Sequence, residues 1–419
     1  MRQPFFAVRR DCMKKGNAGK IILGIMFGII VVLSAILAML TIRNKKAQNA
    51  VAAIQEVQTA DSEENAREEK KTEAEKILET MTLEEKAAQI FFVTPEDITG
   101  VNTATVAGDA TRQALETYPV GGIVYFSKNI LEPEQIRSML ENTWNYSQEV
   151  MKIPVWLGVD EEGGQVARVA ENPMFQVSRY ESMRSIGDTK DPDQAYQAGE
   201  TIAAYLKDLG FNMDFAPDAD VITNPQNTVI GDRSFGTDPA LVGEMTADAV
   251  AGFQDQGISA CIKHFPGHGQ TEGDTHEGYA YTEKTLEEMK NSDLIPFQEG
   301  IKAGTDFVMV SHISAPNALS QDLPASLSSE IITDLLRGEM GYEGIIITDA
   351  MNMGAIAENY DSAQAAVMSF QAGADMILMP EDFQAAYQGI LQAVSSGTIS
   401  EERLNQSVVR ILETKLEKF

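Results

Sequence analysis

The chain has 419 residues, enough for one large domain or two ordinary ones, and its 62 acidic residues outnumber its 33 basic residues. The first 46 residues hold nine basic residues and one acidic residue, so the remainder holds 24 basic and 61 acidic residues, a net charge of −37. So acidic a body repels nucleic acid and anionic lipid surfaces, and we exclude nucleic acid as a partner.

The N-terminal segment has the pattern of a membrane anchor. Residues 21–40 carry no charge and are long enough to cross a hydrocarbon layer of about 30 Å. More basic residues precede this run than follow it, which places the N-terminus in the cytoplasm. We therefore predict a basic cytoplasmic tail over residues 1–20, a single transmembrane anchor over residues 21–42, and the rest of the chain outside. Cleavage of this segment as a signal peptide, followed by secretion, is the alternative.

The segment after the anchor is polar. Residues 43–75 are rich in Ala, Glu, Gln and Lys, which is typical of a solvated stalk. The folded domain then begins near Lys76 and is predicted to span residues 76–419. Thr82 stands ahead of two acidic residues, Glu84 and Glu85, and this order predicts a helix start.

Short apolar runs alternate with longer amphipathic stretches through the rest of the chain. Eight runs have the character of strands: Ala88–Val93, Gly122–Phe126, Val155–Asp160, Asn212–Ala216, Ser259–His264, Phe307–His312, Gly344–Thr348 and Ala374–Met379. Helical patterns lie between them, at Pro133–Met151, Asp193–Leu209, Ala240–Gln256, Leu286–Ala303, Ser328–Met340 and Ser362–Ala372. This alternation predicts an α/β fold, a (β/α)8 barrel in a single domain, with a doubly wound parallel sheet as the alternative.

Polar residues stand at the C-terminal ends of four of the predicted strands. They are Asp160, Lys263 with His264, His312, and Asp349. In a barrel these ends meet at one mouth, where catalytic residues gather. We therefore expect these side chains to lie around a common site.

Asp349 is a candidate nucleophile. A carboxylate fixed at the end of a strand is able to attack an anomeric carbon and form a covalent glycosyl-enzyme. Because a strand end is also where a helix begins, the alternative is that Asp349 is a helix N-cap.

Three of the four histidines, His264, His268 and His276, lie within thirteen residues. Asp274 precedes His276 by two residues in a glycine-bearing loop, where the aspartate would orient the imidazole and stabilise its protonated form. This pair is therefore a candidate acid/base. A surface Asp-x-His pair and a metal site are the alternatives, although the three histidines lack the spacing of a known metal motif, and we expect no metal.

Seven motifs together give the chain a family resemblance. They are Pro119-Val-Gly-Gly-Ile-Val-Tyr-Phe, Asp160-Glu-Glu-Gly-Gly-Gln-Val-Ala-Arg168, Asn212-Met-Asp-Phe-Ala-Pro217, Val229-Ile-Gly-Asp-Arg-Ser-Phe-Gly236, Lys263-His-Phe-Pro-Gly-His-Gly269, Asp274-Thr-His276 and Thr348-Asp349-Ala-Met. On these residues the chain resembles glycoside hydrolase family 3, in its single-domain β-N-acetylglucosaminidase (β-hexosaminidase) branch. One departure is that Asp160-Glu161-Glu162 and Gln165 stand in place of the Asp-Gln-Glu-Gly-Gly-Arg pattern of that branch.

The resemblance implies a role for each matched residue. Asp349 corresponds to the nucleophile, His276 to the proton donor and later base, and Asp274 to the residue that supports the histidine. The positions that bind the sugar are Asp160, Arg168, Arg233, Lys263 and His264. For two of these a structural role is the alternative: a salt bridge of Arg233 with Asp232, and a loop cap by Asp160.

The function expected from the resemblance is retaining exo-β-N-acetylglucosaminidase activity without a metal or organic cofactor. The substrate would be a terminal N-acetylglucosamine on a cell-wall-derived oligosaccharide or muropeptide, and the intermediate a glycosyl ester of Asp349. A β-N-acetylglucosaminide phosphorylase is the first alternative, because a neutral histidine repels phosphate less than a carboxylate does. A stalked sugar-binding protein without catalytic activity is the second.

Overall fold

The computed structural model describes residues 24–29, 32, 33, 39, 41, 45, 68–271 and 280–419. The chain divides into two units, residues 1–69 and residues 70–419. Across the described residues, no helix is both apolar and long enough to cross a membrane. Most of the predicted anchor and stalk lies outside the described residues.

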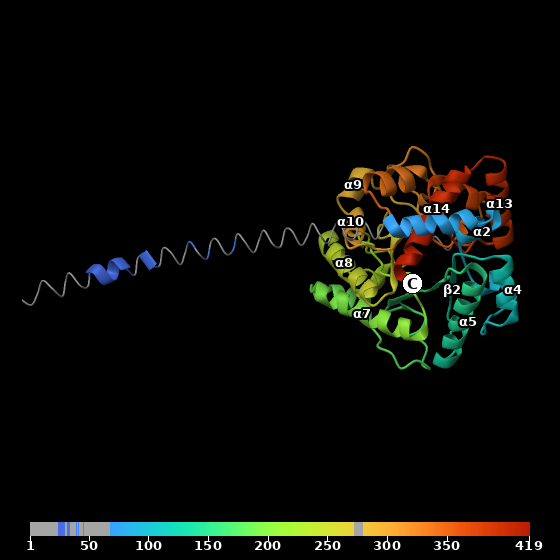
Figure 1. Cartoon of the computed structure of the whole chain (residues 1–419). Helices are drawn as coiled ribbons and strands as arrows, with labels where there is room; N and C mark the ends of the chain where they lie inside the picture. Colours follow the sequence, from blue (N-terminus) through green and yellow to red (C-terminus); the bar gives the residue numbers. More distant parts are fainter. Residues whose placement is uncertain are drawn as a thin grey trace, which may run out of the picture. The chain divides into compact units, whose positions relative to one another are not determined.

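The second unit is built on a parallel barrel (Figure 1). Its strands are β1 (Phe91–Val93), β2 (Gly122–Tyr125), β3 (Trp156–Val159), β6 (Met213–Asp214), β7 (Ser259–Phe265), β8 (Phe307–Val310), β9 (Ile345–Thr348) and β10 (Ile377–Leu378). They pair in chain order, and β10 pairs with β1. A parallel bridge between Ile347 and Met376 joins β9 to the residue before β10 and closes the barrel. The predicted (β/α)8 barrel is thus confirmed, and the doubly wound sheet is wrong.

Helices surround the strands. They are α2 (Leu83–Gln89), α3 (Pro95–Thr99), α4 (Asp109–Thr117), α5 (Pro133–Met151), α6 (Met183–Gly187), α7 (Pro192–Leu209), α8 (Pro239–Asp255), α9 (Leu286–Lys290), α10 (Leu294–Lys302), α11 (Gly354–Ala357), α12 (Ser362–Ala372), α13 (Phe383–Ser395) and α14 (Glu401–Lys418), with residues 70–80 also helical. Two 3-10 turns, η1 (Gly231–Arg233) and η2 (Ala325–Leu327), and a π-helix, η3 (Glu330–Glu339), complete the set. The predicted start at Thr82 is confirmed: its hydroxyl accepts the Glu85 N–H, and the Glu85 carboxylate accepts the Thr82 N–H.

Two predicted elements differ from the structure. Ala88 was expected to open the first strand, but it belongs to α2, where it is buried against the core. The single helix expected over residues 286–303 is two helices, α9 and α10. The side chain of Asp293, between them, is buried and accepts hydrogen bonds from Lys284 and Ser292, which fixes a turn there.

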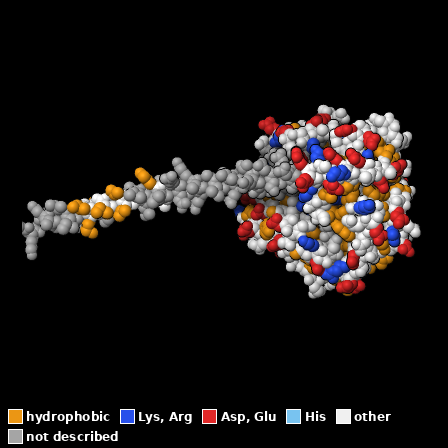
Figure 2. All heavy atoms as spheres, viewed as in Figure 1, with side chains coloured by type: hydrophobic (Ala, Val, Ile, Leu, Met, Phe, Trp, Pro, Cys, Tyr) orange, Lys and Arg blue, Asp and Glu red, His pale blue; other side chains and the backbone are white. Residues whose placement is uncertain are grey.

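The barrel interior is filled by large side chains from facing strands. The rings of Phe92 and Phe215 are 5.1 Å apart in an edge contact, and those of Trp156 and Phe307 are 5.2 Å apart. Gly122 makes room for this packing, because a Cβ atom there would lie 2.3 Å from the Phe92 ring. On the face of the second unit that Figure 2 shows, acidic and basic side chains are interspersed. The tightly packed core gives the strand ends a rigid support.

A hairpin that the periodicity did not predict follows β3. It consists of β4 (Glu161–Gly163) and β5 (Val166–Ala167), paired antiparallel. Gly163 and Gly164 have φ values of +90° and +60°, a backbone conformation that glycine adopts without steric cost. The hairpin therefore turns back at once and stays at the mouth of the barrel beside Asp160.

Candidate active site

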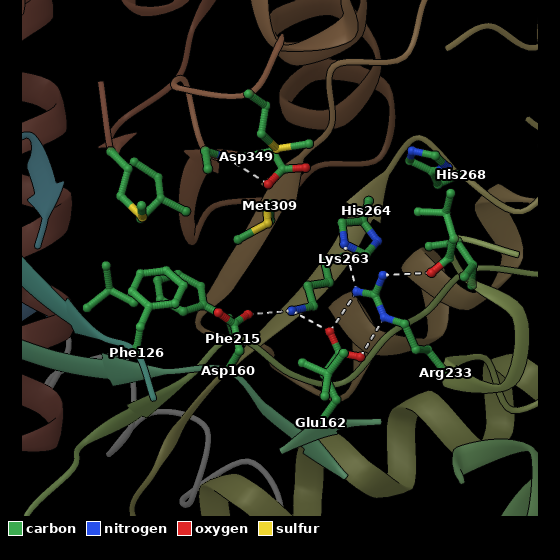
Figure 3. A pocket seen from close by; sticks show the side chains of 18 of the residues that line it. Phe126, Asp160, Glu162, Phe215, Arg233, Lys263, His264, His268, Met309 and Asp349 are labelled. Carbon is green, nitrogen blue, oxygen red and sulfur yellow. Dashed lines mark hydrogen bonds and ion pairs between the residues drawn. The ribbon is translucent and has the colours of Figure 1, made fainter. Parts of the chain in front are cut away.

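A pocket of about 220 Å³ opens at the C-terminal ends of the barrel strands (Figure 3). Its polar lining residues are Asp160, Glu162, Arg168, Arg233, Lys263, His264, His268 and Asp349. Its apolar lining includes Val124, Phe126, Phe215, Met309, Met353 and Leu378. The pocket thus combines a charged part with an apolar part, as small-molecule sites do.

Of the five residues expected at one mouth, four line this pocket, whereas the fifth, His312, is buried and is not among its lining residues. Asp160 follows β3, Lys263 and His264 belong to β7, and Asp349 follows β9. Arg233 reaches the same pocket from η1. Each side chain is therefore held by an element of the barrel or by a turn packed on it, and not by an isolated loop.

Lys263 is the centre of the charged part. Its ammonium lies 2.8 Å from Asp160 Oδ1 and 2.6 Å from Glu162 Oε1, and its side chain is 3% exposed. Burial alone would lower the pKa of Lys263, but the carboxylates of Asp160 and Glu162 raise it above its ordinary value. Lys263 is therefore a fixed cation. Asp160, for which a loop cap was the alternative to sugar binding, is in an ion pair with Lys263.

Arg233 binds Glu162 through two hydrogen bonds. Its Nε lies 2.8 Å from Glu162 Oε2, and its Nη2 lies 2.7 Å from Oε1. Arg233 is thus in a salt bridge, but with Glu162, 71 residues away, and not with the adjacent Asp232. Burial would raise the pKa of Glu162, yet the charges of Arg233 and Lys263 bring it well below its ordinary value. Glu162 is the shared counter-ion of two cations (Figure 3).

His264 continues this network on the other side of Arg233. Its Nε2 lies 3.2 Å from Arg233 Nη2, and its Nδ1 lies 2.7 Å from Asp220 Oδ2. Burial, together with the charge of Arg233, lowers the pKa of His264 to about 4. The imidazole is therefore neutral at neutral pH, with the Nδ1 proton donated to Asp220 and Nε2 accepting from Arg233.

Two buried aspartates lie behind His264. Burial and the repulsion of Asp220 raise the pKa of Asp218, and burial raises that of Asp220. Ligand atoms of Asp218, Asp220 and His264 lie within 4.8 Å of one another, a spacing that a metal ion would accept. Arg233, with Nε 3.6 Å from Asp218, already places a positive charge beside this group. Asp218, Asp220 and His264 are therefore candidate metal ligands that lie beside a guanidinium.

His268 organises the loop that follows β7. Its N–H donates to Asp220 Oδ1 at 2.6 Å, its carbonyl accepts from Asn227 at 2.8 Å, and its Nδ1 lies 2.8 Å from the Thr271 hydroxyl. Its ring also lines the pocket. These bonds hold the loop against the neighbouring strand connection.

Asp349 lies apart from the chain of ion pairs, as Figure 3 shows. Its N–H donates to Val310 O at 2.8 Å, and its Oδ1 accepts from the Ala350 N–H at 2.8 Å. Helix α11 is capped by Met353, so the alternative in which Asp349 is the N-cap is wrong. His312 is buried behind it, with Nε2 2.9 Å from Ala350 O. The turn that carries Asp349 is therefore fixed on both sides.

Arg168 reaches the pocket from the residue after β5. Its guanidinium lies 5.9 Å from the centre of the Phe126 ring. Its main-chain N–H donates to the Asp160 carbonyl at 3.4 Å. Arg168 Nε is buried and has no hydrogen-bond partner within the part of the chain that the structure describes. Such a donor at the edge of a pocket suits a polar group of a ligand.

The two remaining predicted residues, Asp274 and His276, lie outside the described residues. They follow His268, and their positions relative to Asp349 stay a prediction. The described residues add three that the sequence did not single out: Glu162, Asp218 and Asp220. A signal was available for the aspartates, since the stretch from Asn212 to Pro217 continues as Asp218-Ala-Asp220.

The pocket offers the parts of a group-transfer site. A carboxylate held by backbone contacts faces a space lined on another side by fixed cations and carboxylates, all positioned by buried partners. Such groups hydrogen-bond the hydroxyls of a polar, uncharged ligand without reorganisation.

Comparisons with known proteins point the same way. The family model described as "Glycosyl hydrolase family 3 N terminal domain" matches residues 82–414. The chain is 33% identical to Beta-hexosaminidase A of Pseudoalteromonas piscicida over 73% of its own length and 55% of that protein, and 32% identical to a Beta-hexosaminidase of Nitrosomonas eutropha over 75% and 91%. It also superposes on a glycoside hydrolase family 3 beta-N-acetylglucosaminidase from Paenibacillus sp. str. FPU-7 with a TM-score of 0.75 and 38% identity, covering 80% of this chain and 63% of that one.

Proposed function

Since the chain belongs to glycoside hydrolase family 3, we propose that it is a retaining β-N-acetylglucosaminidase that removes terminal N-acetylglucosamine from oligosaccharides, including muropeptides. The observation that carries the proposal is the placement of Asp349 at the end of β9, across the pocket from Asp160, Lys263 and Arg233. The names of the similar proteins support the choice of sugar. The chain spans only 55% of the first of these relatives, so its own substrate is a matter for experiment.

In the proposed mechanism, Asp349 attacks the anomeric carbon as the glycosidic C–O bond breaks. His276 gives a proton to the leaving oxygen, and Asp274 holds the imidazole in the orientation that this transfer needs. A water then gives a proton to His276 and attacks the same carbon, which releases Asp349. Two displacements at one carbon return the β configuration.

The ion-paired residues bind the sugar in this mechanism. Lys263 and Arg233 are neutralised by Asp160 and Glu162, so they present N–H donors without a large net charge. A neutral sugar is bound better by such pairs than by isolated ions, because hydroxyl groups then find donors and acceptors side by side. His264 and Arg168 complete the proposed set of contacts.

The test is turnover of a chromogenic β-N-acetylglucosaminide by the purified protein. Asp349→Ala should abolish turnover, and His276→Ala should lower it at least about a hundredfold, which is the usual scale of general acid–base catalysis. Asp322→Asn, at an exposed position, is the matched control and should have no effect. Full activity of Asp349→Ala would sink the nucleophile assignment, and full activity of His276→Ala would remove the proton donor.

Two product measurements separate the alternatives. Release of the β anomer, followed by NMR before mutarotation, is expected for a retaining hydrolase. If a sugar 1-phosphate forms when phosphate is added, the protein is a phosphorylase. Tight binding of the sugar without any product would identify a sugar-binding protein.

The proposed location is the cell membrane: residues 21–42 are the anchor, and the catalytic domain lies on the outer side. Two features of the sequence support it, the uncharged run and the excess of basic residues before it. Washed membranes should retain the protein at high pH, and protease added to intact cells should degrade its barrel. Recovery from the culture medium in a shortened form would support signal cleavage instead.

A further inference from the structure

The hairpin β4–β5 carries three of the residues that reach the pocket or border it. Asp160 precedes it, Glu162 lies in its first strand, and Arg168 follows its second strand. Both strands are short, and they pair only from Glu161 to Ala167 and from Gly163 to Val166. So few ladder bonds leave the hairpin in need of other contacts to fix its position.

Glu161 supplies those contacts. Its side chain is buried and points away from the pocket, which Glu162 lines, as strand alternation requires. One carboxylate oxygen, Oε2, accepts the Val169 N–H at 2.7 Å. The other, Oε1, accepts the Ala170 N–H at 2.8 Å and the Tyr205 hydroxyl of α7 at 2.7 Å. One side chain thus ties the start of the hairpin to the segment after its end and to the barrel wall.

The main chain of the same residue is held as well. The Glu161 N–H donates at 2.9 Å to Oδ1 of Asp214, the last residue of β6. Asp214 is fully buried, and burial raises its pKa well above the ordinary value. The Asp214 carboxyl therefore fixes the hairpin to the neighbouring strand.

We propose that Glu161 is a positioning residue whose ionised carboxylate clasps the hairpin, so that Asp160, Glu162 and Arg168 are held in the geometry that binds substrate. The proposal rests on the proposed function, because it concerns the same site. The carboxylate has to be ionised because the N–H groups of Val169 and Ala170 and the Tyr205 hydroxyl donate to both of its oxygens, and only the ionised form accepts at both. A neutral glutamine offers one acceptor oxygen, and its NH2 group would face an N–H donor.

The clasp should depend on pH. Burial raises the pKa of Glu161, an effect only partly offset by Val169, Tyr205, Ala170 and the charge of Arg168. Asp214, on β6, also faces it, and the two carboxyls disfavour each other's ionisation. Glu161 therefore takes up a proton at a higher pH than an exposed glutamate. The protonated oxygen becomes a donor, so the clasp opens as the pH falls through that value.

The decisive comparison is kcat/KM of the wild type and Glu161→Gln as a function of pH. At neutral pH the variant should be at least about tenfold lower, because one buried N–H loses its acceptor, and the loss should appear mainly in KM. The ratio of the two should shrink as the pH falls, since the wild type then loses the same clasp. A ratio that is constant with pH, or a fully active variant, would overturn the proposal.

Tyr205→Phe is the second variant, and it leaves both backbone bonds in place. It removes a hydrogen bond that lowers the pKa of Glu161, so the acid limb of its pH profile should move to higher pH. An acid limb at the wild-type position would contradict the proposal. Glu171→Gln, at an exposed carboxylate in the same connection, is the control and should match the wild type at every pH.

Hydrogen exchange separates failure of this proposal from failure of the proposed function. The amides of Val169 and Ala170 should exchange faster in Glu161→Gln than in the wild type at the same pH, whatever the substrate. Unchanged exchange would overturn the clasp even in an active enzyme. Faster exchange together with a wild type that turns over no N-acetylglucosaminide would instead leave the clasp in place and count against the substrate.

Discussion

Replacement of Glu162 by glutamine tests the charge network of the pocket most directly. The side chain is fully buried and has Arg233 at 2.7 and 2.8 Å and Lys263 at 2.6 Å. Glutamine keeps the volume but removes the charge that both cations share. Loss of one partner of a buried ion pair costs about 3–5 kcal/mol. Since Lys263 keeps Asp160 and Arg233 keeps Asp218 nearby, we expect the low end, about 3 kcal/mol in the free energy of unfolding.

The sign of the pH dependence follows from the pKa of Glu162. The folded-state value lies below the ordinary 4.5, because Arg233 and Lys263 outweigh the effect of burial. Its ionisation therefore stabilises the fold fully above pH 4.5, and this stabilisation is lost as the pH falls towards the folded-state pKa. The difference in stability between the wild type and the variant should be constant near neutral pH and should shrink in acid.

Urea unfolding, followed by tryptophan fluorescence, measures the stability of both proteins, and turnover of a chromogenic substrate measures the site. The variant should lose about 3 kcal/mol and at least about tenfold in kcat/KM. Glu171→Gln, which removes an exposed carboxylate nearby, should change neither quantity. Equal unfolding curves for the wild type and Glu162→Gln would refute the reasoning, because the buried cations would then not depend on this carboxylate.

Three further substitutions have separate expected outcomes. His312→Ala removes the imidazole that fixes the turn behind Asp349, so kcat should fall about tenfold with little change in KM, and a changed KM alone would contradict this role. Lys415 is buried, and burial lowers its pKa from 10.5 to about 7. Between these two pH values the unfolded chain holds a proton that the folded protein has lost, so the free energy of unfolding of the wild type should rise with pH. Urea unfolding curves of Lys415→Met should lack that rise. Asp375→Asn removes the charge of a buried carboxylate that is paired with Arg337 and Arg410. It should lower the free energy of unfolding by about 3 kcal/mol without changing KM, and an unchanged urea midpoint would contradict this.

The architecture was accessible from the sequence because it depends on local patterns. Eight apolar runs alternate with helical stretches, and polar residues follow several of the runs, so both the barrel and its mouth could be predicted. Asp160, Lys263 and Asp349 were placed correctly by this reasoning alone. The C-terminal ends of all the strands of a parallel barrel lie at the same face, so a residue at such an end is placed at the mouth.

The ion pairs could not be predicted from the sequence, because they join residues that are far apart in the chain. Arg233 was given its sequence neighbour Asp232 as a partner, but the fold brings it to Glu162 instead. Adjacent residues in a turn point in different directions, whereas the barrel brings the side chains of η1 and β4 into one pocket. The hairpin was not predicted for a different reason, which is that its strands are too short to show an alternating pattern.

Glu161 and Glu162 show how one position in a strand decides the chemistry of a side chain. Successive residues of a strand point to opposite faces, so Glu162 meets two cations while Glu161 meets a hydroxyl and two backbone amides. Burial raises the pKa of both carboxyls. At Glu162 the charges of Arg233 and Lys263 outweigh burial and bring the pKa below its ordinary value, whereas at Glu161 the amide and hydroxyl hydrogen bonds offset burial only in part and the pKa stays raised. As a solution is acidified, Glu161 takes its proton first, when the ion pairs of Glu162 are still intact. Activity should thus be lost through the hairpin before stability is lost through the charge network.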